Sequence, residues 1–294
     1  MKVKISFGEK VFDSINIIFM FILMIVMFYP LWHVFCSSLS ENSALMAHSG
    51  ALLKPVGFNL KSYEAVFQNP MILKGYENTI FVLGFGLFVN MVMTAIAAYV
   101  LSQKGVYFNP LFMKLMVFTM YFNGGLIPGY LLVTRTLHMN NSLWALIFPV
   151  AINTYNLIIM KTSFMSLPDS LYESAKLDGA GHWTILLKIV LPLSKSILAV
   201  IALYYAVAHW NAWFGASIYL KDRSKYPLQL VLREILIQND ISAMTKGVAD
   251  ADQLGLSETI KHAVIIVATV PILIIYPFLQ KYFVKGTMTG AVKG

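Results

Sequence analysis

One polar segment, between Lys161 and Lys195, holds the residues best suited to specific chemistry. Its glutamate offers a carboxylate to a partner's cation, its small residues allow close approach, and its apolar residues supply contact area. An ordered hydrophilic loop between apolar stretches indicates a surface that a partner binds from the aqueous side. The pattern consists of Glu173-Ser174-Ala175, three residues, Gly179, nine residues, and then Ile189-Val190-Leu191-Pro192.

The same segment predicts two short helices joined by a glycine elbow. Ser166 can cap a helix start that has Pro168 in its first turn, and a short helix then runs from Tyr172 to Leu177. Gly179 ends it, because glycine is the usual residue just past a helix end. Glu173 and Leu177 share one face of this helix, and Leu171 and Ala175 share another. A second amphipathic stretch follows with apolar residues three, four and seven apart, Trp183, Leu186, Leu187 and Val190, before Pro192.

An alternative is that this segment is a pair of interfacial helices lying on lipid headgroups. That alternative explains the amphipathic pattern of the segment. It does not explain why a glycine, an alanine and a lone glutamate occur at these spacings.

The elements around this segment are apolar enough to lie in a membrane. Of the 294 residues, 58% are hydrophobic and 12% charged, whereas soluble proteins carry about a quarter charged residues. Six charge-free windows approach or exceed the roughly 20 residues that a spanning helix needs. In lipid, an isolated run of this kind can satisfy its backbone hydrogen bonds only as a helix. The sequence therefore predicts an all-α polytopic membrane protein with a single domain, 1–294. Its six helices are expected at about 14–36, 78–102, 113–134, 141–164, 196–220 and 260–282, with a polar loop at 165–195.

The charges predict an orientation. An even number of crossings puts both termini on one side, and twelve of the 22 Lys and Arg residues lie on that side. This bias is small, but Lys2, Lys4 and Lys10 at the N-terminus also favour the cytoplasm. Both termini are therefore expected in the cytoplasm, with the first helix retained. The net charge of +8 reflects topology and lipid headgroups, so no nucleic-acid partner is implied.

Glycine and proline interrupt the third apolar window. Proline removes a helix hydrogen bond, and neighbouring protein must satisfy the freed groups in lipid. A gate or hinge and a tight packing site of small residues both remain open for Gly124, Gly125 and Pro128.

The pattern E-x-A-x3-G-x9-I-x-L-P resembles the EAA loop in membrane subunits of binding-protein-dependent ATP-binding-cassette importers. Ser174 stands where that family usually has a second alanine. The resemblance extends over nearly the whole chain and points to the carbohydrate branch, the maltose-importer type. Supporting stretches are Gly125-Leu126-Ile127-Pro128, the run 167–173 and the C-terminal run 285–294.

The resemblance implies a bacterial inner-membrane assembly. Its partners are a second permease subunit in a heterodimer, two ATPase subunits, an extracytoplasmic solute-binding protein and the bilayer. Residues 221–261 would meet the binding protein, and 286–294 could reach the ATPases. This chain has no G-x4-G-K-[S/T] phosphate loop, so the ATPase subunits would bind ATP and Mg, and this chain would be neither an enzyme nor a cofactor carrier. The expected ATPase-coupling residues are Tyr172, Glu173, Ser174, Ala175, Leu177, Asp178, Gly179, Ala180, Ile189, Leu191 and Pro192.

The expected cargo is an oligosaccharide, which proteins hold by hydrogen bonds and aromatic faces. Polar side chains at membrane depth usually face the bundle or a water-filled cavity. They can instead form interhelical hydrogen bonds, with the aromatic rings in an interfacial belt, and none shows a metal-ligand pattern. The candidate substrate path comprises Asn153, Tyr155, Asn156, Tyr205, His209, Trp210, Asn211 and Trp213.

The stretches 209–214 and 226–230 are similar to a subgroup that imports oligosaccharides, including acidic ones from pectin or alginate. The windows offer no lysine or arginine to pair with a uronate, so the acidic cargo stays open. The alternatives are an ion-coupled secondary transporter and a permease for a non-sugar solute. A secondary transporter would need ionisable residues near the midplane, and the windows contain only histidines of this kind: His33, His138, His209 and His262.

Overall fold

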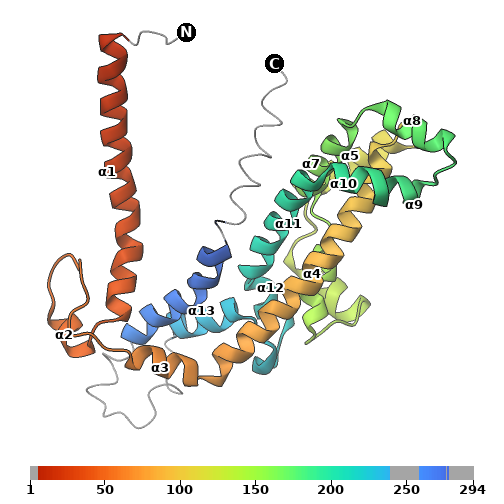
Figure 1. Ribbon diagram of the computed structural model, residues 1–294. Helices are drawn as coiled ribbons and strands as arrows, with labels where there is room; N and C mark the ends of the chain where they lie inside the picture. Colours follow the sequence, from red (N-terminus) through yellow and green to blue (C-terminus); the bar gives the residue numbers. More distant parts are fainter. Residues whose placement is uncertain (1–5, 239–257, 276, 278–294) are drawn as a thin grey trace. The chain divides into compact units, whose positions relative to one another are not determined.

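The computed structural model describes residues 6–238, 258–275 and 277, and the regular elements within them are helices. The predicted all-α class is confirmed. The chain divides into two compact units, Met1–Asn69 with Glu234–Val270 and Pro70–Arg233 with Pro271–Gly294, and Figure 1 shows the helices along the chain. The single membrane domain therefore stays a prediction. Among the residues that the structure describes, three helices are long and apolar enough to cross a membrane, or up to six if each of three bent pairs is one span.

The first unit is dominated by a long apolar helix, α1 (Phe7–Ser38). A capping box starts it, since Ser6 Oγ accepts from Glu9 N at 3.3 Å and Glu9 accepts from Ser6 N at 2.6 Å. None of its most apolar window is buried within the chain, as expected for a surface that lipid covers. This unit also contains α2 (Asn42–Ala47), α3 (Lys61–Gln68), the part of α13 (Leu228–Gln238) from Glu234 on, and the helix Glu258–Ile275 up to Val270.

The end of α1 is fixed to the segment that follows it. Trp32 Nε1 donates to Leu53 O at 2.9 Å, and Tyr29 accepts from Leu52 N at 3.1 Å. These two bonds fold the chain after α1 back onto its last turns.

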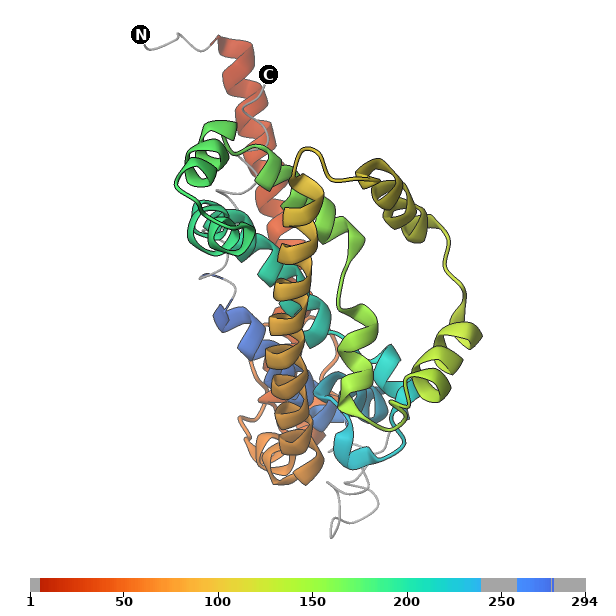
Figure 2. The same cartoon turned by 90° about the vertical axis from the view of Figure 1, so that its right-hand side faces the viewer.

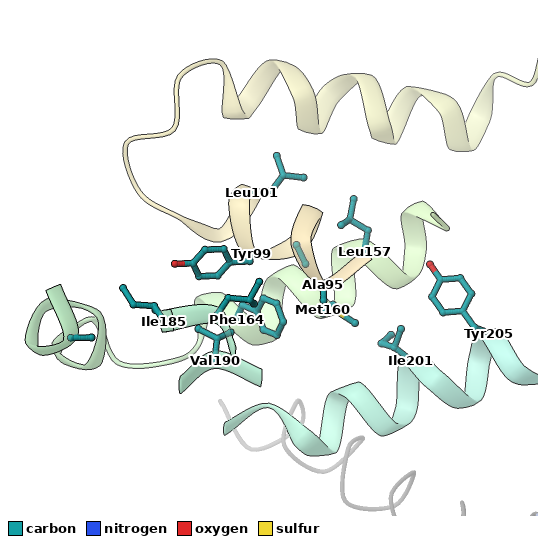
Figure 3. Packing of buried hydrophobic residues seen from close by; sticks show 13 residues of the cluster. Ala95, Tyr99, Leu101, Leu157, Met160, Phe164, Ile185, Val190, Ile201 and Tyr205 are labelled. Atoms are coloured by element: carbon teal, nitrogen blue, oxygen red, sulfur yellow. The ribbon is translucent and has the colours of Figure 1, made fainter. Parts of the chain in front are cut away.

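The second unit is built around α4 (Pro70–Ser102), which packs against α7 (Thr154–Met165) and α11 (Lys195–Trp210). Their buried side chains form one cluster with residues of the polar loop, in which Phe164 lies beside Val190 (Figure 3). The remaining elements are α5 (Asn109–Tyr121), α6 (Leu126–Leu131), the π-helical turn Leu132–Thr136, the 3-10 turns Leu143–Leu146 and Phe148–Val150, α8 (Asp169–Leu177), α9 (His182–Ile185), the π-helical turn Leu186–Val190, α10 (Leu191–Leu193), α12 (Phe214–Tyr219), the 3-10 turn Arg223–Lys225 and α13 (Leu228–Gln238).

The two ends of α4 hold two different regions of this unit. Near one end, Asn78 Nδ2 donates to Ser224 O at 2.8 Å. Just beyond the other end, Lys104 pairs with Asp169 of α8. Asn78 and Ser102 are separated by roughly 36 Å along the axis at about 1.5 Å per residue, which exceeds the roughly 30 Å hydrocarbon core of a bilayer. Figure 2 shows the loop after α7 (green) and the segment after α11 (cyan) at opposite ends of the gold α4 ribbon.

The first two predicted helices are observed and are longer than expected, because α1 and α4 extend beyond 14–36 and 78–102. The sixth, at 260–282, is described as Glu258–Ile275, and its predicted end lies outside the described residues.

The other three predicted helices, 113–134, 141–164 and 196–220, are not continuous. The third is bent by 112° between α5 and α6, where Gly125 has φ 89° and donates to Asn123 Oδ1. The fourth begins as 3-10 turns and bends by 48° before α7. The fifth stops at Trp210 and resumes at Phe214 as α12. Apolar composition identified these windows, but it does not report the local backbone breaks within them.

Candidate functional site

The predicted glycine elbow is present at the end of α8. Gly179 has φ 78°, a left-handed conformation that favours glycine. Its N–H donates to Lys176 O at 3.0 Å, and the next N–H, of Ala180, donates to Ala175 O at 2.9 Å. This pair of bonds is a Schellman motif, so local backbone chemistry ends the helix. Asp169 in the first turn and Lys176 in the last complement the helix dipole.

The predicted start of this helix is wrong by several residues. The helix begins at Asp169 rather than Tyr172, with Pro168 at the N-cap position. Ser166 does not cap it, because this serine follows the end of α7 and its hydroxyl donates to Ser163 O at 2.7 Å.

α8 presents two different faces. Ala175 is only 7% exposed and belongs to the buried cluster, together with the half-buried Tyr172. Leu177 is 89% exposed, and Glu173 is exposed as well. An apolar side chain and a carboxylate therefore project from a helix whose other face is anchored in the core. Ser174 and Asp178 are also exposed, and Ala180 is half-buried.

The second part of the loop divides its apolar residues between two faces. Leu186 and Val190 are buried with Ile185, whereas Leu187 is exposed and Trp183 is 63% exposed. A π-helical turn at Leu186–Val190 widens the helix by one residue, which shifts the α-helical register that the sequence spacing assumes. Ile189 and Leu191 are half-buried, and Pro192 is exposed.

Polar contacts attach the loop to the end of α4. Lys104 Nζ lies 2.5 Å from Asp169 Oδ2, and this hydrogen bond raises the pKa of Lys104 above its usual range, so its ammonium group stays charged. Tyr99 Oη lies 3.2 Å from His182 Nδ1. Tyr172 Oη donates to Phe164 O at 3.3 Å, and burial raises the pKa of this hydroxyl. These contacts attach the loop to both α4 and α7.

Two cavities flank this attachment. The larger measures about 520 Å³ and lies between the end of α4 and the loop, with Tyr99, His182 and Trp183 in its wall. The smaller measures about 260 Å³ and is lined by Asp169, Tyr172 and Glu173 among others. Of these two cavities, the smaller is lined by predicted coupling residues, Tyr172 and Glu173.

The predicted gate residues lie at the 112° bend between α5 and α6. Gly124, Gly125 and Pro128 are all exposed within the described chain. The bend occupies the residues between Phe122, which is extended, and Gly125, whose positive φ at the N-cap of α6 favours glycine. Whether the bend moves during transport stays a prediction.

Two of the predicted path residues link the helices of the core. His209 Nε2 lies 2.6 Å from Asn90 Oδ1, while Asn90 Nδ2 donates to Val150 O and Ala151 O. Because the amide nitrogen is the donor to the two carbonyls, Oδ1 is the acceptor and His209 Nε2 carries the proton. Tyr205 contacts Thr94 Oγ1 at 2.8 Å and accepts from Asn153 N at 2.9 Å. These contacts match the alternative that such residues form interhelical hydrogen bonds.

The other path residues are more dispersed. Asn153 caps α7 by accepting from Asn156 N at 3.1 Å, and Asn156 is buried. Tyr155 is 55% exposed, and Asn211 is exposed just past the end of α11. Trp210 is buried and contacts the ring of Tyr76, whereas Trp213 is half-buried and lies under the guanidinium of Arg233. Among the described residues, no group of three or more His, Cys, Asp or Glu could hold a metal ion.

The sequence interpretation missed a stripe on α4. Gly86, Asn90, Thr94 and Ala98 occur every four residues and are buried. A Cβ on Gly86 would lie 2.5 Å from His209 Nε2, so only glycine permits this approach. The four-residue spacing of small and polar residues within an apolar window was a signal that could have found the stripe. Arg233 was also missed, and no local pattern links it to Trp213.

The chain matches known transport proteins over nearly its whole length. Residues 6–289 match the family described as binding-protein-dependent transport system inner membrane component. The polygalacturonan/rhamnogalacturonan transport system permease protein YtcP of Bacillus subtilis is 41% identical over 291 residues, which are 97% of this chain and 99% of that protein. Protein LplC of the same organism is 41% identical over 285 residues, with coverage of 97% and 96%.

A solved structure is similar as well. It belongs to a bacterial ABC transporter involved in the import of the acidic polysaccharide alginate. The TM-score is 0.86 at 30% identity, and the match covers 95% of this chain and 98% of that chain.

The helical core, the elbowed loop and these similarities define a membrane permease with the fold of type I ABC importers. The chain belongs to the family of binding-protein-dependent transport system inner membrane components. The predicted resemblance to importer permeases of the carbohydrate type is thereby confirmed. This family is a transport component and not a catalytic subunit.

Proposed function

We propose that this chain forms half of the translocation path of an ATP-driven importer for a uronate-containing oligosaccharide. A second permease subunit forms the other half in a heterodimer, and two ATPase subunits bind ATP and Mg on the cytoplasmic side. A solute-binding protein delivers the cargo from outside, and both termini of this chain lie in the cytoplasm. Family membership favours this assembly over an ion-coupled secondary transporter.

The two faces of α8 carry the coupling part of the proposal. Leu177 is 89% exposed beside the carboxylate of Glu173, whereas Ala175 is buried in the core. A partner surface with an apolar cleft and a cation would cover the exposed face. The buried face and the contact between Lys104 and Asp169 would pass the partner's motion to the helices.

Similar proteins support a uronate-containing oligosaccharide as the cargo. Polygalacturonan and alginate are polymers of uronic acids, and a permease for one and a transporter for the other are similar to this chain over almost its full length. A permease for a neutral oligosaccharide or for a non-sugar solute is the alternative.

ATP hydrolysis by the assembled complex tests the proposal. The complex is purified through a tag on this chain, reconstituted in proteoliposomes and supplied with its binding protein. We expect an ATPase and a second permease to co-purify, and hydrolysis to rise with tetragalacturonate but not with maltotetraose. Absence of the ATPase would contradict the coupling role. Equal stimulation by maltotetraose would contradict the acidic cargo.

A further inference from the structure

Arg233 of α13 stacks on Trp213, a residue of the candidate path. Its guanidinium carbon lies 3.7 Å from the centroid of the indole ring, well within the roughly 6 Å range of a cation–π contact. Trp213 itself packs against a buried cluster that includes Leu146 and Ala216. The ring is therefore a fixed platform, whereas Arg233 is exposed.

Stacking leaves the edge of the guanidinium free. The five N–H donors of arginine lie in the plane of the group, so a ring beneath that plane does not occupy them. A carboxylate can then approach the edge and accept two parallel hydrogen bonds. No salt bridge to Arg233 is found among the residues that the structure describes.

The surrounding segment is cationic. Residues 221–233 contain four Lys or Arg residues and one acid, which gives a net charge of +3. The acid, Asp222, accepts from Ser224 N at 2.9 Å, and this bond lowers the pKa of Asp222. The carboxylate of Asp222 is therefore already used as an acceptor within its own turn. A cationic surface of this kind attracts anionic solutes.

The location of the Arg233–Trp213 pair fits the entrance of the candidate substrate path. Trp213 follows the break after α11, the helix that carries Tyr205 and His209. The segment around Ser224 is bound near the end of α4 opposite to the coupling loop. If that loop faces the cytoplasm, the stacked pair lies on the extracytoplasmic side.

We propose that Arg233 binds the carboxylate of a uronate ring at the extracytoplasmic mouth, and that Trp213 positions its guanidinium. This inference rests on the proposed function and supplies the cation that the apolar windows lack. Arg233 would thus distinguish acidic from neutral oligosaccharides.

The test compares one cargo in two charge states. Tetragalacturonate and its methyl ester, which has no carboxylate charge, are supplied with the binding protein to the reconstituted full complex, and uptake is measured. For Arg233→Gln we expect the KM for tetragalacturonate to rise by about fivefold, with little change for the ester. Arg233→Lys keeps the charge but not the planar fork, so we expect part of the same loss. Trp213→Leu should act like Arg233→Lys.

Lys221→Gln is the matched control, because it removes one charge from the same segment. Its KM for tetragalacturonate should rise by much less than about fivefold, because the variant removes only part of the long-range attraction and leaves the stacked pair intact. An equal loss for both cargoes in Arg233→Gln would indicate a structural role and overturn the inference, as would no loss at all. If Arg233→Gln does not assemble, Arg233→Lys decides the question. If the wild type transports neither cargo, the proposed function fails and this inference fails with it.

Discussion

At the scale of single residues, the core of the second unit depends on one close approach. His209 donates to Asn90 at 2.6 Å, and the same asparagine donates to two carbonyls of the segment before α7. Asn90 thus connects α4, α11 and the 3-10 turns through one side chain. A buried polar group that loses its partner carries the full desolvation penalty, so this contact is sensitive to small changes.

Gly86→Ala should disrupt this contact. The new Cβ would lie 2.5 Å from His209 Nε2, so the imidazole must move away from Asn90. We expect a loss of about 1–3 kcal/mol, measured as a lower midpoint of thermal inactivation of the purified complex. Gly84→Ala is the control, because nothing lies within 4 Å of its Cβ. Equal midpoints for the two variants would contradict the importance of the close approach.

At the scale of elements, α8 is a short helix held on one side only. The Schellman motif at Gly179 ends it, and the ion pair of Asp169 with Lys104 attaches its first turn to the end of α4. The exposed ion pair is worth little by itself. The burial of Ala175 and the packing of Tyr172 against the core are therefore the main attachments of the helix.

Glu173→Lys should stop transport while leaving the fold intact. The side chain is exposed, so the substitution creates no buried charge within this chain, but it would place a cation against the partner's presumed cation. We expect uptake by the reconstituted complex to be lost, with the complex assembled or weakened. Glu77→Lys, another exposed charge reversal near the other end of α4, should retain uptake. Normal uptake by Glu173→Lys would remove Glu173 from the coupling role.

At the scale of the whole molecule, the long helix α4 connects two chemically different surfaces. The polar loop at 165–195 is attached beyond Ser102, and the cationic segment 221–233 is attached near Asn78. The separation of these two ends exceeds the hydrocarbon thickness of a bilayer. The two surfaces therefore belong to opposite aqueous sides if α4 spans the membrane.

Labelling with a membrane-impermeant thiol reagent tests this arrangement. Cys36 is the single cysteine of the sequence and is buried, so Cys36→Ser provides a background without a thiol. In intact cells we expect Lys221→Cys to be labelled and Leu177→Cys to stay unlabelled, because both positions are exposed but on opposite sides. Inside-out vesicles from cells that lack the ATPase subunits should show the reverse, because the partner would otherwise cover position 177. Labelling of Leu177→Cys from the cell exterior would contradict the proposed orientation.

The sequence by itself determined the membrane class and the local form of the polar loop at 165–195. Apolar runs and a glycine just past a helix end act through neighbouring residues, so composition and spacing report them directly. The Schellman bonds around Gly179 span only a few positions along the chain. The predicted start of α8 was less accurate, because the Ser166 hydroxyl donates to Ser163 O in α7 and does not cap α8.

Only the tertiary structure decided which distant residues meet. His209 and Asn90 are 119 residues apart, and Arg233 comes from α13 to lie over Trp213. The breaks inside three apolar windows were likewise not given by hydropathy. Such contacts depend on how helices pack, and packing is set by the joint shape of several segments, which spacing along one segment does not encode.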